Sequence, residues 1–250
     1  MSGIVKILRS FWAIWGALIY GSTILIQLPL AFVCFEVFKE KGVRFMIWLG
    51  LTIHSWIVLT LCGIIVLNRG KEQVPKDKAY VIVSNHRSQL DILVNAATTP
   101  VLFKYLSKAE VTKIPVLGYF VRKGCITIDR SSRSSKNAGF SAMEKTIRDQ
   151  FSVLIYPEGT RNRTQEPLKN MYNGAFRLAI LTQTPILVTT LIGTDKLSNP
   201  NRKLDFSPGI VRTYWAPPIS TEGMTEDDIP RLREQVQEIM LSNLTTGTSA

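Results

Sequence analysis

Residues 79–97 read AYVIVSNHRSQLDILVNAA, and this stretch indicates the class of the fold. Its first six residues, Ala79–Ser84, are an apolar run typical of a buried strand. Ser88–Ala97 is predicted to form a helix that begins a few residues after the strand ends. A strand that leads directly into a helix is the repeating unit of α/β proteins.

The same alternation continues outward from this stretch to the C-terminus. Further strands are predicted at residues 101–105, 125–128, 152–156, 186–192 and 210–215, and further helices at 135–150, 170–181 and 225–244. Thr225 and Asp228 have the spacing of a capping box at the start of the last helix, and residues 245–250 are expected to be a disordered polar tail. We therefore predict an α/β fold with a central, mostly parallel or mixed sheet flanked by helices.

Two long apolar runs precede this region. Phe11–Phe35 contains no charged residue, and Phe45–Leu67 contains only His54 as a titratable imidazole. At about 1.5 Å per helical residue, either run could cross a hydrocarbon core of about 30 Å. We therefore predict an N-terminal two-helix membrane hairpin over residues 1–71, followed by one domain over residues 72–250. The alternative is a pair of buried helices in a soluble protein.

The charges around the hairpin leave its depth open. Lys39, Lys41 and Arg44 lie at its tip, and further basic residues lie at both of its ends. A hairpin that spans the bilayer would place the tip charges outside, against the positive-inside tendency, whereas a hairpin within one leaflet avoids this conflict. In either topology the rest of the chain is expected on the cytoplasmic face of the inner membrane.

The overall charge favours an anionic partner. The chain has 30 Lys and Arg residues against 19 Asp and Glu residues, a formal net charge of +11. The predicted membrane segments favour a lipid as this partner. Nucleic acid is not expected, because no basic run carries interleaved aromatic residues. Three cysteines without a C-x-x-C pair predict neither a disulfide framework nor a zinc site.

His86 is the only plausible histidine base, since His54 lies inside an apolar run. Ser88 can cap the helix that follows His86, and this places Asp91 at the third helical position, where its carboxylate can turn back toward the imidazole. One ring nitrogen would then donate to the carboxylate while the other accepts a proton. The alternative is that Ser88 and Asp91 form only a capping box.

Three further clusters are candidates for binding an anion. Tyr156–Arg161 follows a predicted strand, and its Arg161 can hold a phosphate with two parallel hydrogen bonds, assisted by backbone N–H groups around Gly159. The second cluster ends in Asp129 and Arg130, which form either a structural ion pair or another anion contact. Lys104 and Lys108 form the third, and either could equally be a solvated charge.

These segments resemble the motifs of the 1-acylglycerol-3-phosphate acyltransferases, a family within the glycerolipid acyltransferases. NHRSQLD (85–91), GCITIDR (124–130) and YPEGTRN (156–162) are similar to its first three motifs, and Pro185 is similar to the proline of the fourth. The resemblance covers roughly residues 70–220 and has the motifs in the family's order. Asn173 departs from the pattern, because the family often has a basic residue there, and this leaves the choice of acceptor open.

The resemblance implies a membrane-bound enzyme that moves a fatty acyl group. The donor would be acyl-CoA or acyl-carrier protein, and the acceptor the sn-2 hydroxyl of 1-acylglycerol-3-phosphate (lysophosphatidic acid), which becomes phosphatidic acid. His86 and Asp91 would be catalytic, and the substrate-binding residues would be Glu158, Gly159, Thr160, Arg161, Arg130, Lys108 and Lys104. No cofactor or metal is expected. The alternatives are another acceptor, such as glycerol-3-phosphate or lyso-ornithine lipid, a hydrolase, and a non-catalytic lipid-binding protein.

Overall fold

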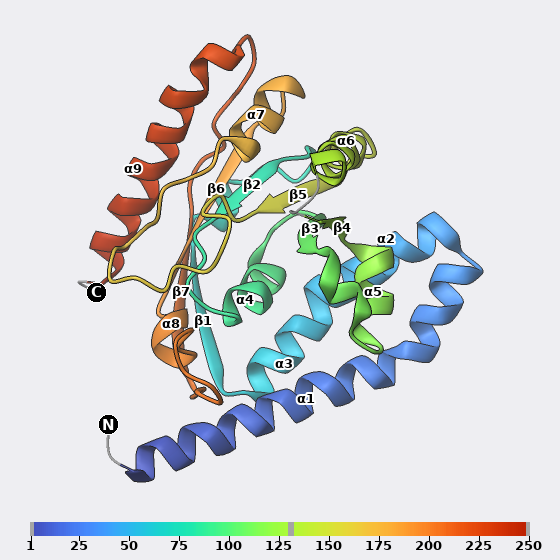
Figure 1. The fold of residues 1–250 in the computed structure, drawn as a ribbon, viewed down its shortest axis with the longest axis vertical. Helices are drawn as coiled ribbons and strands as arrows, with labels where there is room; N and C mark the ends of the chain where they lie inside the picture. The colour runs from blue at the N-terminus through green and yellow to red at the C-terminus, as the bar shows by residue number, and fades with distance from the viewer. Residues whose placement is uncertain (1–2, 130–132, 249–250) are drawn as a thin grey trace.

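The predicted alternation of strands and helices builds a seven-stranded sheet in the computed structural model, which describes residues 3–129 and 133–248 (Figure 1). The strands lie in the order β1-β7-β6-β2-β5-β3-β4. Neighbouring strands run parallel except β6 and β7, which are antiparallel. The strands are β1 (Ile64–Arg69), β2 (Val81–Ser84), β3 (Phe103–Lys108), β4 (Ile126–Ile128), β5 (Ser152–Ile155), β6 (Ile186–Ile192) and β7 (Gly209–Trp215). The prediction of a mostly parallel or mixed sheet is confirmed.

Helices cover both faces of this sheet. They are α1 (Gly3–Glu36), α2 (Lys39–Leu49), α3 (Ser55–Leu61), α4 (Leu90–Thr98), α5 (Leu117–Gly124), α6 (Arg133–Arg148), α7 (Gly174–Leu181), α8 (Thr194–Leu197) and α9 (Ile229–Thr248). A π-helical turn (Gly50–His54) joins α2 to α3, and short 3₁₀ turns lie at Lys71–Gln73, Ala109–Lys113 and Glu226–Asp228. The capping box of Thr225 and Asp228 is present, as predicted.

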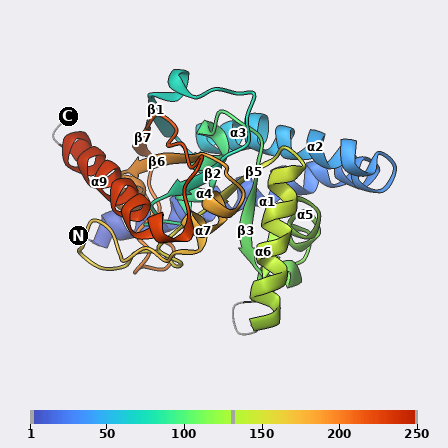
Figure 2. The same ribbon diagram turned by 90° about the horizontal axis from the view of Figure 1, so that it is seen from above.

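The side-chain alternation of the central strands assigns the two faces. Val81 and Val83 of β2 lie in a core with α6, α7 and α9, whereas Tyr80 and Ile82 point to the opposite face. On that opposite face α3 and α4 pack against β6, β7 and β1. Figure 2 shows α6, α7 and α9 on one side of the sheet and α2 and α3 on the other. This arrangement follows from the period of two along a strand.

Most predicted bounds shift by a few residues, and two predicted segments differ from the structure in kind. The apolar run that ends at Leu67 is helical only to Leu61, and after a turn at Gly63 (φ +68°) its last residues form β1, paired with β7. The first four residues of β1, Ile64–Leu67, are as apolar as the helix before them, so composition does not separate the two elements. Residues 245–248, expected as a disordered tail, continue α9. The division of the chain at residue 71 stays a prediction.

The N-terminal helices lie along the base of the molecule (Figure 1). Two helical stretches, Gly3–Glu36 and Lys39–Leu61, are long and apolar enough to cross a membrane by length and composition. Near the start of α1, Arg9 forms an ion pair with Asp205, and its guanidinium donates to the carbonyls of Lys196 and Leu197. At its other end, Glu36 pairs with Lys123 of α5 at 3.0 Å. Both ends of α1 are therefore tied to elements that belong to, or pack beside, the sheet.

The outer face of α1 is an apolar stripe open to solvent. Residues spaced by seven along the helix share this face: Ile4, Phe11, Leu18, Leu25 and Phe32, whose side chains are 72%, 63%, 62%, 56% and 60% exposed. The inner face buries Ile24, Ala31, Cys34 and Phe35. An exposed apolar stripe of this length indicates that α1 contacts an apolar environment.

Candidate active site

The loop after β2 is pinned to the neighbouring strand before it reaches His86. The buried side chain of Asn85 donates to the carbonyl of Leu191 at 2.9 Å and accepts from the Leu191 N–H at 2.7 Å. Asn85 therefore continues the pairing with β6 through its side chain and fixes the position from which His86 leaves the sheet. Sequence reasoning did not assign Asn85 this role.

A single carboxylate oxygen orients His86. Asp91 Oδ2 accepts from His86 Nδ1 at 2.8 Å and from the backbone N–H groups of Arg87 and Ser88, each at 2.7 Å. The Asp91 side chain is fully buried, while that of His86 is 14% exposed. Within the described residues His86 Nε2 has no hydrogen-bond partner. The predicted geometry, in which Asp91 turns back to the imidazole from the first turn of a helix, is present.

The segment after β5 holds His86 from a second direction. The Tyr156 ring stacks on the imidazole with centroids 4.0 Å apart and planes 18° from parallel. Glu158, also buried, accepts from the His86 N–H at 2.8 Å and from the Lys169 N–H at 2.9 Å. Burial raises the pKa of Glu158 above its ordinary value, and these two N–H groups oppose the rise. Glu158 therefore links three segments of the site through their backbones.

The turn at Gly159 leads directly into Thr160 and Arg161. Gly159 has φ +72°, and its N–H donates to the Tyr156 carbonyl at 3.0 Å. The Gly159 N–H is therefore already engaged, although the sequence suggested that it would help to bind an anion. The Thr160 hydroxyl accepts from Lys169 Nζ at 3.0 Å. Two residues later, the Asn162 N–H donates to the His86 carbonyl at 2.6 Å. Arg161 lies between them, half-buried, and its guanidinium has no partner among the described residues.

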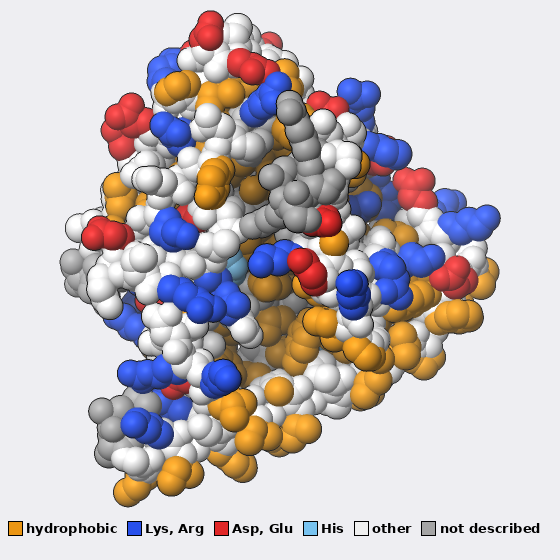
Figure 3. All heavy atoms as spheres, in the orientation of Figure 1, with side chains coloured by type: hydrophobic (Ala, Val, Ile, Leu, Met, Phe, Trp, Pro, Cys, Tyr) orange, Lys and Arg blue, Asp and Glu red, His pale blue; other side chains and the backbone are white. Residues whose placement is uncertain are grey.

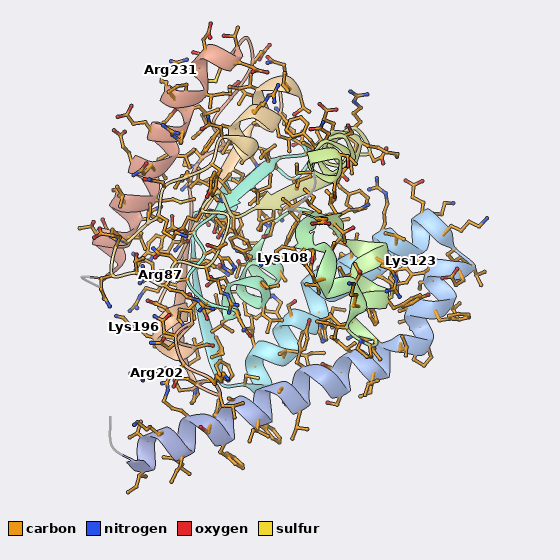
Figure 4. The ribbon with its side chains drawn as sticks, viewed as in Figure 1. Arg87, Lys108, Lys123, Lys196, Arg202 and Arg231 are labelled. Carbon is orange, nitrogen blue, oxygen red and sulfur yellow. The ribbon has the colours of Figure 1, made fainter. Side chains whose placement is uncertain are left out.

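The surface view shows where these groups open to solvent. Figure 3 shows a histidine side chain in a hollow of the surface, with Lys and Arg side chains on both sides of it. In the same view as Figure 1, Figure 4 places Arg87 and Lys196 on one side of α4 and Lys108 on the other. Arg87 is engaged, because it donates to Asp195 of α8 at 3.0 Å and to the Glu166 carbonyl at 2.8 Å.

The remaining candidates are not all brought to this edge of the sheet. Lys108 ends β3 and is exposed at the same carboxyl edge as His86. Lys104 pairs in register with Val153 at the opposite end, where its ammonium lies 4.9 Å from the centre of the Phe151 ring and burial lowers its pKa. Pro185 also lies at that far edge, where its carbonyl accepts from Val81. Arg130 lies outside the described residues.

An imidazole held by a buried carboxylate at the carboxyl edge of a parallel sheet is typical of enzymes that remove a proton from a bound hydroxyl group. The comparison with known sequences narrows this class. A sequence model of the family described as Acyltransferase matches residues 65–191, about half of the chain, and the chain belongs to that family.

Several curated relatives carry a more specific name. The 1-acyl-sn-glycerol-3-phosphate acyltransferase alpha of Mus musculus is 34% identical over 73% of this chain and 64% of its own length. The 1-acyl-sn-glycerol-3-phosphate acyltransferase of Saccharomyces cerevisiae is 30% identical over 79% of this chain and 65% of its own. The chain thus spans just under two thirds of the length of these relatives. Asn173, where the motif departs, accepts a hydrogen bond from Arg233 of α9 at 3.1 Å.

A solved structure shares the fold across the whole chain. The crystal structure of the 1-acyl-sn-glycerophosphate acyltransferase PlsC from Thermotoga maritima superimposes with a TM-score of 0.79. The match covers 100% of this chain and 99% of that one, at 21% sequence identity. At this identity the likeness concerns the fold, including the N-terminal helices.

Proposed function

We propose that the chain transfers a fatty acyl group from a thioester donor, acyl-CoA or acyl-carrier protein, to the sn-2 hydroxyl of 1-acylglycerol-3-phosphate. The observation that carries the proposal is the 2.8 Å contact of His86 Nδ1 with the buried Asp91 carboxylate, which leaves Nε2 without a partner among the described residues. The names of the relatives at 30–34% identity support the choice of acceptor.

His86 acts as a general base in this reaction. Nε2 takes the proton of the acceptor hydroxyl while its oxygen attacks the thioester carbonyl carbon. The Asp91 carboxylate stabilises the imidazolium that forms, as in a serine-hydrolase relay in which a substrate hydroxyl replaces the serine. When the C–S bond breaks, the imidazolium returns the proton to the departing thiolate. Since the thioester is already activated, no acyl-enzyme is needed.

Arg161 is proposed to bind the glycerol phosphate. Its guanidinium is unpaired within the described chain, and Asn162 beside it is bonded to the His86 carbonyl at 2.6 Å. A phosphate held there by two parallel hydrogen bonds lies next to the base. Glu158 holds the loop in shape by accepting hydrogen bonds from backbone N–H groups, and Gly159 permits the turn of the loop. Thr160 and Lys169, which are hydrogen-bonded to each other, add polar side chains at the edge of the loop. Lys108 and Arg130 remain proposed phosphate contacts, and the proposal does not extend to Lys104.

We further propose that the enzyme works on the cytoplasmic face of the membrane, with α1 parallel to the bilayer surface. Arg9 and Glu36 lie near opposite ends of α1, and both form ion pairs with the sheet side of the molecule. A helix that crossed the bilayer would have to carry one of these ion pairs across the hydrocarbon core, where charges are strongly disfavoured. With α1 in one leaflet, its apolar stripe contacts lipid chains and the site stays at the headgroup level.

The test is thioester consumption and lipid product formation by purified protein in lipid nanodiscs, with both donors crossed against several lysolipids and glycerol-3-phosphate. His86→Gln should abolish transfer while it retains folding and membrane association, and His54→Gln is the matched control. Transfer by His86→Gln at the wild-type rate would refute the proposal. Product from another acceptor alone would correct the substrate, and thioester loss without lipid product would identify a hydrolase.

Arg161→Ala tests the phosphate contact separately. This variant should raise the KM for the phosphorylated acceptor about 10-fold or more, consistent with about 1.5–3 kcal/mol for a hydrogen bond to a charged group. Arg163→Ala, an exposed neighbour two residues away, is the matched control. An unchanged acceptor KM in Arg161→Ala would remove Arg161 from the site.

A further inference from the structure

Tyr156 and His86 form a ring pair that the proposed reaction does not account for. Their ring centroids are 4.0 Å apart with an interplanar angle of 18°, so the phenol covers one face of the imidazole. A second contact constrains the imidazole at its edge, where Nδ1 lies 2.8 Å from the Asp91 carboxylate. One contact fixes an edge and the other fixes a face, and together they determine the direction of Nε2.

The Tyr156 ring is itself held in place from α4. Its hydroxyl accepts from Asn95 Nδ2 at 3.1 Å, and the same amide donates to Ser84 Oγ at 3.0 Å. Asn95 is fully buried and lies one helical turn after Asp91. Because residues four apart share a helix face, α4 presents both the carboxylate and the amide to the site. The two constraints on His86 therefore come from one rigid element.

The Tyr156 hydroxyl has no acid–base part in this arrangement. Burial raises its pKa well above the usual range for tyrosine, and the nearby Asp91 carboxylate adds to the rise. The phenol therefore stays neutral when the imidazole takes up a proton. What it offers the imidazole is the negatively polarised face of an aromatic ring, which attracts a cation placed above it.

We infer that Tyr156 is a positioning residue that holds the imidazole face-on and stabilises the imidazolium formed when the acceptor hydroxyl is deprotonated. The inference rests on the proposed function of His86 as the base. The ring contributes more to the charged state of the imidazole than to the neutral state, so it acts on the step in which charge develops. Its removal should therefore lower kcat more than it raises KM.

The other charged and titratable groups around His86 must stay constant in the test. They are Asp91 from α4, Glu158 from the loop after β5, and Arg87 from the same loop as His86, together with Arg161, which the proposed function places beside the base. Arg87 is itself paired with Asp195. Variants at residue 156 leave all of them in place. Tyr105 supplies a matched control: it lies in the same core as Tyr156, but its ring packs on Phe103 at 4.8 Å and its hydroxyl donates to the Ile92 carbonyl.

The first measurement does not depend on activity. The chain has two histidines, so NMR of the full chain in nanodiscs gives two imidazole Hε1 signals, which His54→Gln assigns. In Tyr156→Leu the titration midpoint of the His86 signal should fall by about 0.4 to 1.5 pH units, from the usual range of cation–π interactions. Tyr156→Phe, which keeps the ring, should restore most of this change, and Tyr105→Leu should not produce it.

The second measurement is the pH profile of acyl transfer. The acidic limb of kcat/KM should move to lower pH with the NMR midpoint, and kcat in Tyr156→Leu should fall about 2- to 30-fold. If Tyr156→Leu does not fold, a fluorinated phenylalanine at residue 156 keeps the ring volume and weakens its negative face, and it should shift the midpoint in the same direction. An unchanged midpoint, or an equal shift in Tyr105→Leu, overturns the inference. Failure of the proposed function is seen separately, as transfer by His86→Gln.

Discussion

Replacement of Asp91 by asparagine isolates the charge of the carboxylate from its shape. In the wild-type protein Asp91 Oδ2 accepts three hydrogen bonds, two of them from backbone N–H groups. The amide oxygen of asparagine can take that position and keep the backbone donors satisfied. Asp91→Ala would instead leave all three donors without their acceptor and confuse catalysis with unfolding.

The expected loss of stability follows from the second oxygen. Asp91 Oδ1 is buried and has no hydrogen-bond partner among the described residues, so the amide NH₂ that replaces it would find no acceptor. A buried unsatisfied donor costs about 1–3 kcal/mol. For a chain of this length that corresponds to a fall in Tm of about 2–12 °C, and the variant remains folded.

The expected loss of rate is larger. Opposite unit charges roughly 4 Å apart attract each other by about 4 kcal/mol at an effective dielectric constant of about 20. If about half to all of this attraction is present in the transition state, Asp91→Asn should lower kcat by about 30- to 1,000-fold. Release of free thiol from the donor at saturating acceptor measures kcat directly.

Asp195→Asn is the control for a general effect of charge. Asp195 pairs with Arg87 at 3.0 Å, one residue from His86, but does not contact the imidazole. Its kcat should change less than about fivefold, since a partly exposed ion pair of this kind contributes about 0–1 kcal/mol. Wild-type kcat in folded Asp91→Asn, or an equal loss in both variants, would refute the carboxylate's role.

Three further predictions concern the loop and the N-terminal helix. Burial raises the pKa of Glu158, so the contribution of this carboxyl group to stability is greatest at low pH and is lost as the pH rises through its raised pKa. The wild-type Tm should therefore fall more steeply than the Tm of Glu158→Gln between about pH 4 and 7, and parallel plots of Tm against pH would contradict this. Gly159→Ala puts a methyl group 2.8 Å from the Tyr172 ring at φ +72°, and urea unfolding should show a loss of about 1–2 kcal/mol; unchanged stability would show that the turn relaxes. Spin labels at positions 4, 11, 18, 25 and 32 should report one common membrane depth, whereas steps of about 10 Å between successive labels would indicate a spanning helix.

The sequence predicts the His86–Asp91 pair because that contact is local. The two residues are five apart, and the start of one helix brings them together, so cap chemistry and helix geometry are sufficient. The contacts of Tyr156 and Glu158 with His86 join residues 70 or more apart. They depend on β5 lying beside β2. The order of strands in a sheet cannot be predicted from the local pattern of apolar and polar residues.

The direction of β3 alone could have predicted which of Lys104 and Lys108 lies at the edge of the sheet that carries the site. In a parallel sheet the site lies at the carboxyl ends of the strands. Lys104 is the second residue of β3 and Lys108 is the last, so only Lys108 lies at the edge that carries His86. The same rule points to Tyr156, which directly follows β5. The helix–strand boundary near Gly63 lacked such a signal, because the sequence is apolar on both sides of it.

The packing around α4 connects the apolar N-terminal helices to the candidate site. Leu90, Val94 and Ala97 of α4 share a core with Val58 and Leu59 of α3, while Asp91 and Asn95 face His86 and Tyr156. The same helix therefore packs on the N-terminal helices with one face and orients His86 with another. Composition separates the apolar N-terminus from the rest of the chain, but β1 and α3 are part of the support of the site.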